Sequence, residues 1–171
     1  MTLKESLSKE HIYYELNKIN SVLQNRNLYL NLRIVGGAAL LFNGISAVET
    51  VDIDVINYIS DELKDICYDF SLDINDDALD YIDDFKDCEF IYDDRKQFSN
   101  ITISYLPVGS VIKTKLKNYQ DEYKAEKLLY LLEDVLDVEM TVSGIANYLE
   151  EQDEIPDLYD IEQFLIAVGY I

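Results

Sequence analysis

The stretch that decides the fold is RIVGGAALLFNGISAVETVDIDVIN, which runs from Arg33 to Asn57. Residues 32–35 are apolar apart from Arg33 and end in β-branched side chains, which predicts a short buried strand. Gly36-Gly37 predicts a sharp turn, because no Cβ obstructs the backbone or a ligand there. Residues 38–42 are small or helix-favouring and predict a short helix that stops at Asn43-Gly44.

Two carboxylates lie two residues apart on the next predicted strand, residues 51–56. Side chains alternate between the faces of a strand, which places Val51, Ile53 and Val55 on one face and Asp52, Asp54 and Ile56 on the other. Neighbouring carboxylates repel each other. A bound Mg²⁺ or Mn²⁺ would offset this, because Mg²⁺ is commonly held by one or two carboxylates together with substrate phosphates. The alternative interpretation is a solvated edge strand in an acidic chain.

The combination of strand, glycine turn, short helix and Asp-x-Asp strand is more specific than either motif alone. Gly36-Gly37-Ala38-Ala39-Leu40, Thr50 and Asp52-Ile53-Asp54 resemble the signature of the nucleotidyltransferase fold. Within that fold the pattern is most similar to small bacterial proteins related to AbiEii-type toxins. Their pattern is roughly Gly-Gly-x-Ala-Leu followed by Arg-x-Thr-x-Asp-Ile-Asp.

The resemblance implies a site and a reaction. Asp52 and Asp54 would hold Mg²⁺ (or Mn²⁺), which binds a nucleoside triphosphate. Gly36-Gly37 and Thr50 would be nucleotide-binding, and Lys115 would offset phosphate charge. A hydroxyl of a protein, RNA or small acceptor would then attack the α-phosphate, and pyrophosphate would leave. A toxin–antitoxin or phage-defence setting, with an antitoxin partner, follows from the same resemblance.

The chain also departs from the pattern of these relatives. Val48 stands where they carry arginine, and the strand predicted over residues 101–106 contains no third carboxylate. Asp93 or Asp94, in the preceding turn, is a candidate substitute. Two functions therefore stay open: a metal-dependent nucleotidyltransferase, or a catalytically degenerate protein of that fold whose acidic surface binds a partner.

Composition narrows the choice of partners. The chain of 171 residues has 34 acidic against 14 basic side chains, a net charge of −20. Such a surface repels polyanions, so bulk nucleic acid is an unfavourable partner. No apolar run approaches the roughly 18 residues that span a bilayer. The first residues, Met-Thr-Leu-Lys-Glu-Ser, do not show the charged-then-apolar pattern expected of a signal sequence. Cys67 and Cys88 are too few for a disulfide framework. These features predict a cytoplasmic protein without membrane association.

The remaining pattern predicts an α+β fold in one nucleotidyltransferase-like domain, residues 1–171: a mixed sheet of about four strands with helices packed on it and a helical C-terminal third. Its parts are an N-terminal helix within 1–28, an α/β core over 29–107 and a helical part over 108–171. Ser6 or Ser8, Ser60, and Thr141 or Ser143 are the predicted helix caps. Residues 89–92 and 101–106 predict a hairpin, and Pro156 is predicted in the first turn of the last helix.

Overall fold

The computed structural model describes residues 6–171, so residues 1–5 of the predicted N-terminal part, 1–28, lie outside the described range. The contacts divide the chain into two compact units, Met1–Pro107 and Val108–Ile171. Each unit is described by itself. The assignment of the whole chain to one domain stays a prediction.

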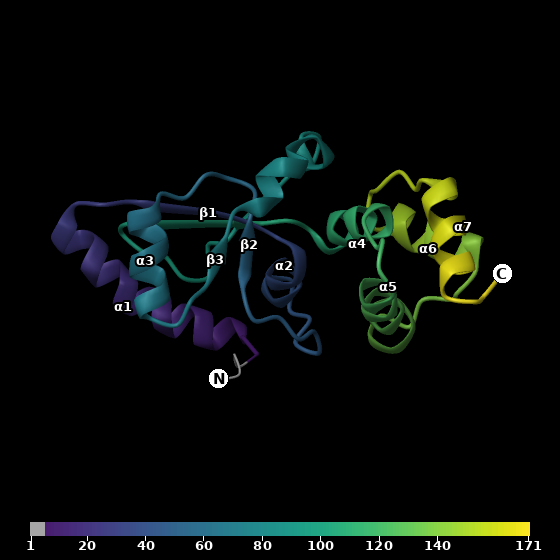
Figure 1. The fold of residues 1–171 in the computed structure, drawn as a ribbon, viewed down its shortest axis with the longest axis horizontal. Helices are drawn as coiled ribbons and strands as arrows, with labels where there is room; N and C mark the ends of the chain where they lie inside the picture. The colour runs from purple at the N-terminus through teal and green to yellow at the C-terminus, as the bar shows by residue number, and fades with distance from the viewer. Residues whose placement is uncertain (1–5) are drawn as a thin grey trace. The chain divides into compact units, whose positions relative to one another are not determined.

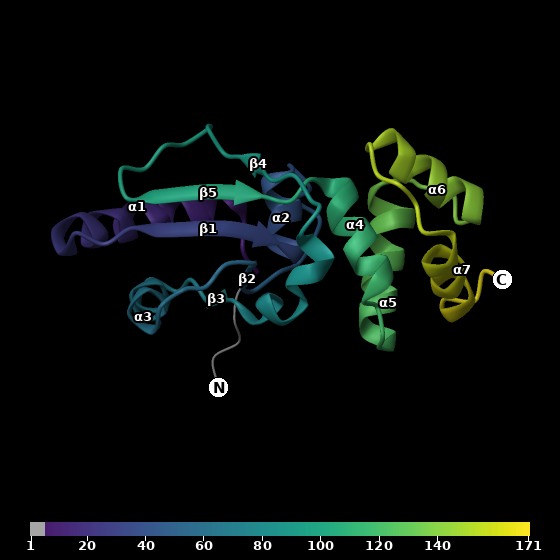
Figure 2. The ribbon, with the colours of Figure 1, turned by 90° about the horizontal axis from the view of Figure 1, so that it is seen from above.

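The first unit is built on a five-stranded mixed sheet with the order β3-β2-β1-β5-β4. Its strands are β1 (Leu30–Val35), β2 (Ile53–Val55), β3 (Ile74–Asn75), β4 (Ile91–Tyr92) and β5 (Ile101–Tyr105). β1 pairs with β5 in parallel, as Figure 2 shows, and with β2 in antiparallel. β3 pairs with β2 in parallel, and β4 with β5 in antiparallel. The predicted hairpin is confirmed. The strand β3 was not predicted, because two residues carry no alternating pattern.

The helices of the first unit are α1 (Lys9–Arg26), α2 (Gly36–Phe42) and α3 (Asp61–Asp69), followed by a 3₁₀ segment, η1 (Asp77–Phe85). Figure 1 shows α1 and α2 on one side of the strands and the teal η1 segment on the other. The core consists of the inward residues of α1, including Ile12, Leu16 and Ile19, and the alternating apolar residues of the strands.

The second unit is helical, as predicted. It contains α4 (Val108–Lys117), α5 (Glu122–Leu129), a π-helical segment η2 (Tyr130–Val135), α6 (Val142–Glu151) and α7 (Leu158–Ala167). Its buried side chains include Leu132, Ile145 and Phe164, and the Phe164 ring meets the edge of Tyr119 at 5.5 Å between centroids. The mixed sheet followed by this helical part confirms the predicted α+β class.

Three helix caps were predicted correctly, and for two of them the sequence offered a choice of two residues. The hydroxyls of Ser8, Ser60 and Thr141 accept hydrogen bonds from backbone N–H groups in the first turns of α1, α3 and α6. The predicted position of Pro156 is wrong. Asp157 caps α7 by accepting a hydrogen bond from the Asp160 N–H, so Pro156 precedes the cap. None of the helices in residues 6–171 has the length and apolar character needed to cross a membrane.

Candidate functional site

The end of β1 and the strand β2 form the centre of the candidate site. Ile34 pairs with Val55, and Val35 pairs with Asp54, in antiparallel register. The chain then leaves β1 at Gly36, where α2 begins. The glycine turn and the Asp-x-Asp segment therefore meet at one edge of the first unit, as the short connection between them predicts.

Both glycines allow the turn to pack directly against the Asp-x-Asp segment. Gly36 has φ +64°, a conformation that side chains disfavour, and a Cβ at this position would lie 3.1 Å from Asp54 Oδ2. A Cβ on Gly37 would lie 3.1 Å from both Cβ and Oγ1 of Thr50. The structure thus brings together four residues predicted from the sequence to form the site: Gly36, Gly37, Thr50 and Asp54.

Asp52 lies just before β2 and is tied to the same loop. The Thr50 hydroxyl donates to the Asp52 carbonyl at 3.1 Å, and the Thr50 carbonyl accepts from the Leu7 N–H at 2.8 Å. The side chains of Asp52 and Asp54 are half-buried, whereas Ile53 is fully buried. The two carboxylates are therefore accessible at the rim of the sheet.

The strand that carries the Asp-x-Asp segment is shorter than the predicted range of residues 51–56. β2 spans only Ile53–Val55. Val51 is 39% exposed and Ile56 is 3% exposed. Both residues lie outside β2, so the alternation predicted for residues 51–56 applies only to Ile53–Val55.

Lys115 lies on α4 of the second unit. Its predicted action on phosphate charge depends on a partner in the first unit, so that role stays a prediction. β5 does not supply a third carboxylate. On β5, the residues that share the carboxylate face of the sheet are Thr102 and Ser104. In residues 6–171, no three side chains of the His, Cys, Asp and Glu types gather in an arrangement that could hold a metal ion.

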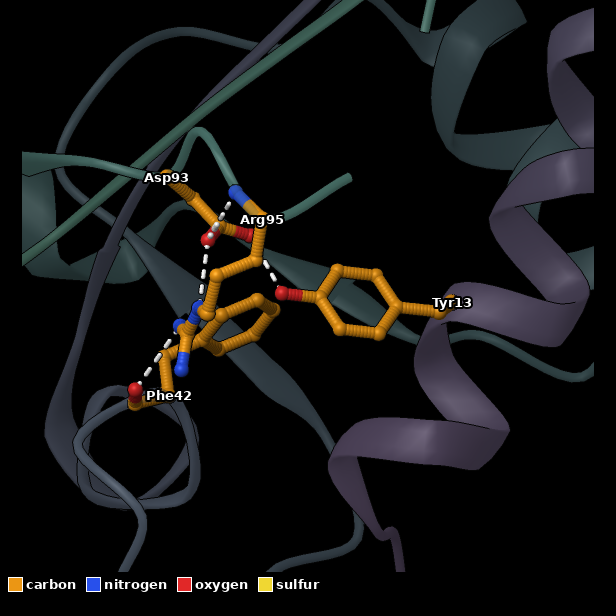
Figure 3. A network of polar contacts seen from close by, with 4 residues as sticks. All are labelled: Tyr13, Phe42, Asp93 and Arg95. Carbon is orange, nitrogen blue, oxygen red and sulfur yellow. Dashed lines mark hydrogen bonds and ion pairs between the residues drawn. The ribbon is translucent and has the colours of Figure 1, made fainter. Parts of the chain in front are cut away.

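Asp93, the candidate substitute ligand, belongs to a different network, shown in Figure 3. Its Oδ1 accepts from Arg95 Nε at 2.8 Å, and its Oδ2 accepts from the Tyr13 hydroxyl. Burial and this hydrogen bond raise the pKa of Tyr13 well above its usual range. Both carboxylate oxygens of Asp93 thus have protein donors. Asp94, the other candidate, is exposed.

This network was not predicted from the sequence, although it contacts the helix that begins at the Gly36 turn. Arg95 Nη2 donates to the carbonyl of Phe42 at 2.8 Å, at the last residue of α2. The guanidinium therefore satisfies one carbonyl at the end of the helix that begins at Gly36. The Asp-x-Arg pattern at residues 93–95 was the available signal, but its partners Tyr13 and Phe42 are distant in the sequence.

Comparison with known proteins adds one finding. A family model described as "Nucleotidyltransferase of unknown function (DUF6036)" matches residues 12–111. The matched range contains Gly36, Asp52 and Asp54 and ends before Lys115. Searches of curated proteins and of solved structures found no match.

Proposed function

The chain belongs to this nucleotidyltransferase family, and from that premise we propose that it transfers a nucleotide from a nucleoside triphosphate to an acceptor hydroxyl. One observation carries the proposal: the Asp54 carboxylate lies against the turn at Gly36, where a Cβ would approach it to 3.1 Å. A carboxylate beside a turn without side chains leaves room for a cation and phosphates next to the backbone.

The residues at this turn suit a divalent cation. Asp52 and Asp54 supply carboxylate oxygens, the ligands that Mg²⁺ and Mn²⁺ prefer. When bound, the cation would neutralise charge on the triphosphate and on the leaving pyrophosphate. In this proposal Gly36-Gly37 and Thr50 line the path of the phosphates, and Lys115 contributes positive charge as a point donor.

The acceptor and the biological setting follow from the family and the charge together. We propose a protein or small-molecule acceptor in preference to bulk RNA, because a net charge of −20 repels a polyanion. The AbiEii-type resemblance adds a toxin-like role with an antitoxin partner. A partner of this kind would be expected to carry a basic surface.

A binding titration tests the proposal. Calorimetry with each of the four triphosphates, with and without Mg²⁺ or Mn²⁺, should detect binding that depends on the metal. The double variant Asp52→Asn/Asp54→Asn should lose it, because the amides do not provide the charge that holds the cation. A thermal shift seen only when metal and triphosphate are both present would agree. Equal triphosphate affinity with and without metal would refute the proposed site.

A second pair of variants isolates the turn. Gly36 and Gly44 both have positive φ, at +64° and +86°, but a Cβ on Gly44 would meet no atom within 4 Å. Each alanine substitution should therefore destabilise the fold by about 1–2 kcal/mol through backbone strain. Only Gly36→Ala should also weaken metal-dependent triphosphate binding, because it alone crowds Asp54. Equal binding by the two variants would remove the turn from the site.

Catalysis is tested with α-³²P-labelled triphosphates, a divalent metal and a bacterial lysate. Label transfer should disappear in Asp52→Asn and in Asp54→Asn. Lys115→Ala should transfer more slowly while remaining folded, because it removes one positive charge without removing a metal ligand.

The second candidate function is a catalytically degenerate protein that binds a basic partner through its acidic surface. The net charge of −20 and the carboxylate-free strand β5 favour it. The same labelling assay separates the two functions. If no acceptor is labelled, and a basic partner co-purifies with wild type and with Asp52→Asn/Asp54→Asn alike, the binding function holds.

A further inference from the structure

Arg33 lies on the face of the sheet opposite α1 and α2, on the strand that leads into the Gly36 turn. Its neighbours Leu32 and Ile34 point into the core with no exposed surface. Alternation along β1 places Arg33 on the opposite face, where it is half-buried. β1 therefore carries a basic side chain on this face, and the sequence motif does not include it.

Strand register places Arg33 on the same face as the carboxylates. Asp54 is the pairing partner of Val35, and Val35 is two residues beyond Arg33 on β1. Residues two apart on a strand are separated by about 7 Å, and paired strands by about 5 Å. Arg33 and Asp54 are thus diagonal neighbours across the β1–β2 pair, within the length of a bound triphosphate.

The guanidinium of Arg33 reaches over the other neighbouring strand, β5. Arg33 pairs with Ser104, and Ser104 pairs with Tyr92 on β4. Phe90, just before β4, lies beneath the guanidinium, with Arg33 Cζ 4.2 Å from its ring centroid. On this face, Asp54 therefore lies on one side of β1, and the Arg33 guanidinium, which contacts Phe90, lies on the other side.

The partner of Arg33 differs from those of three other basic side chains of the first unit. Arg26, Lys64 and Arg95 each form an ion pair with a carboxylate. Within residues 6–171, the interaction found for the Arg33 guanidinium is with the aromatic ring of Phe90. The N–H donors of a guanidinium lie in its own plane and are not used in a contact with an aromatic face, so they can bind an anion.

We propose that Arg33, held on Phe90, binds a phosphate group of the triphosphate whose metal is held by Asp52 and Asp54. This inference rests on the proposed function and adds a binding residue to the same site. The planar guanidinium matches the geometry of phosphate oxygens. It also supplies positive charge on the side of β1 opposite the carboxylates, where no side chain of β5 carries a charge.

The test uses calorimetry of the full chain with Mg²⁺–ATP and with Mg²⁺–tripolyphosphate, which has phosphates but no nucleoside. Arg33→Met should weaken both ligands about tenfold or more, because hydrogen bonds to charged groups are the strong ones. Arg26→Met is the matched control: it removes the same charge from α1 and should leave both affinities unchanged. Circular dichroism and the unfolding midpoint establish that each variant is folded.

Two further variants keep the test informative if Arg33→Met does not fold. Arg33→Lys retains the charge but not the planar fork, and Phe90→Leu removes the stacking surface, so each should weaken binding several-fold. Wild-type affinity in all three variants would refute the inference and leave the proposed function intact. Weaker ATP with unchanged tripolyphosphate binding would also refute it, because Arg33 would then contact the nucleoside. If wild type binds neither ligand, the proposed function itself fails.

Discussion

Asp93→Asn separates a structural carboxylate from a metal ligand. The Asp93 side chain is completely buried, and it joins two segments of the first unit through Arg95 and Tyr13. Asparagine has nearly the same shape but no charge, and its amide nitrogen cannot accept a hydrogen bond. The substitution thus leaves one donor, Arg95 or Tyr13, facing a group that cannot accept from it.

The structure sets the expected size of this effect. Removing one member of a buried ion pair costs roughly 3–5 kcal/mol. The Arg95 side chain is 39% exposed, so water recovers part of that loss, and about 2–4 kcal/mol is expected. A protein of this size loses about 2–4 °C of unfolding midpoint per kcal/mol, so the midpoint should fall by roughly 4–16 °C. Tyr13→Phe removes one hydrogen bond and should cost about 1–2 kcal/mol.

The assay combines urea denaturation with metal-dependent triphosphate binding on the same samples. Asp94→Asn is the control, because it removes the same charge from an exposed neighbouring position. We expect Asp93→Asn to be destabilised and to bind triphosphate like wild type below its unfolding midpoint. A variant with wild-type stability that has lost metal-dependent binding would refute this reasoning and make Asp93 the missing third ligand.

Three further predictions concern single residues. Burial raises the pKa of the Cys67 thiol from 9.0 to about 12, so folding favours the protonated thiol. The stability that the protonated thiol contributes should be complete below about pH 9 and should be lost toward pH 12. Urea titrations of wild type and Cys67→Ala across this pH range would measure the loss. The hydrogen bond from Lys64 lowers the pKa of Asp76. The stability contributed by the Asp76 carboxylate is therefore present above the ordinary pKa of 3.8 and is lost as the pH falls. Asp76→Asn should unfold more easily than wild type at neutral pH, and the difference between the two should be smaller at about pH 3. A Cβ on Gly144 would lie 2.3 Å from the Glu139 carbonyl oxygen, so Gly144→Ala should lower the free energy of unfolding by about 1–3 kcal/mol in chemical denaturation.

The local parts of the fold could be predicted because their signals lie within a few residues. Gly36 marks the turn, Ser60 and Thr141 mark helix starts, and alternation marks β5. The pairing of β1 with β2 also followed, because a short connection favours neighbouring strands. These features depend on propensity and spacing, which a single sequence contains.

The polar contacts around the site could not be predicted, because they join residues that are far apart in the chain. Arg33 meets Phe90 only because β5 pairs with β1 in one particular register. Asp93 meets Tyr13 because α1 packs near the segment that follows β4. Neither contact has a spacing signal, since the partners are fixed by tertiary packing. The short strand β3 was missed for a related reason: its pairing with β2 defines it, and its own two residues do not.

The glycine turn bears on the choice between an enzyme and an acidic binding protein. A surface that acts only through net charge requires no particular backbone at the end of β1. Here Gly36 adopts φ +64°, and a Cβ at this position would lie 3.1 Å from Asp54 Oδ2, closer than an ordinary contact. In residues 6–171 the site lacks a third carboxylate, which would add repulsion toward a triphosphate, and Arg33 adds positive charge on the same face of the sheet. Two carboxylates and one guanidinium around a turn without side chains favour a site that binds a metal–triphosphate complex, with the acidic surface left to select the partner.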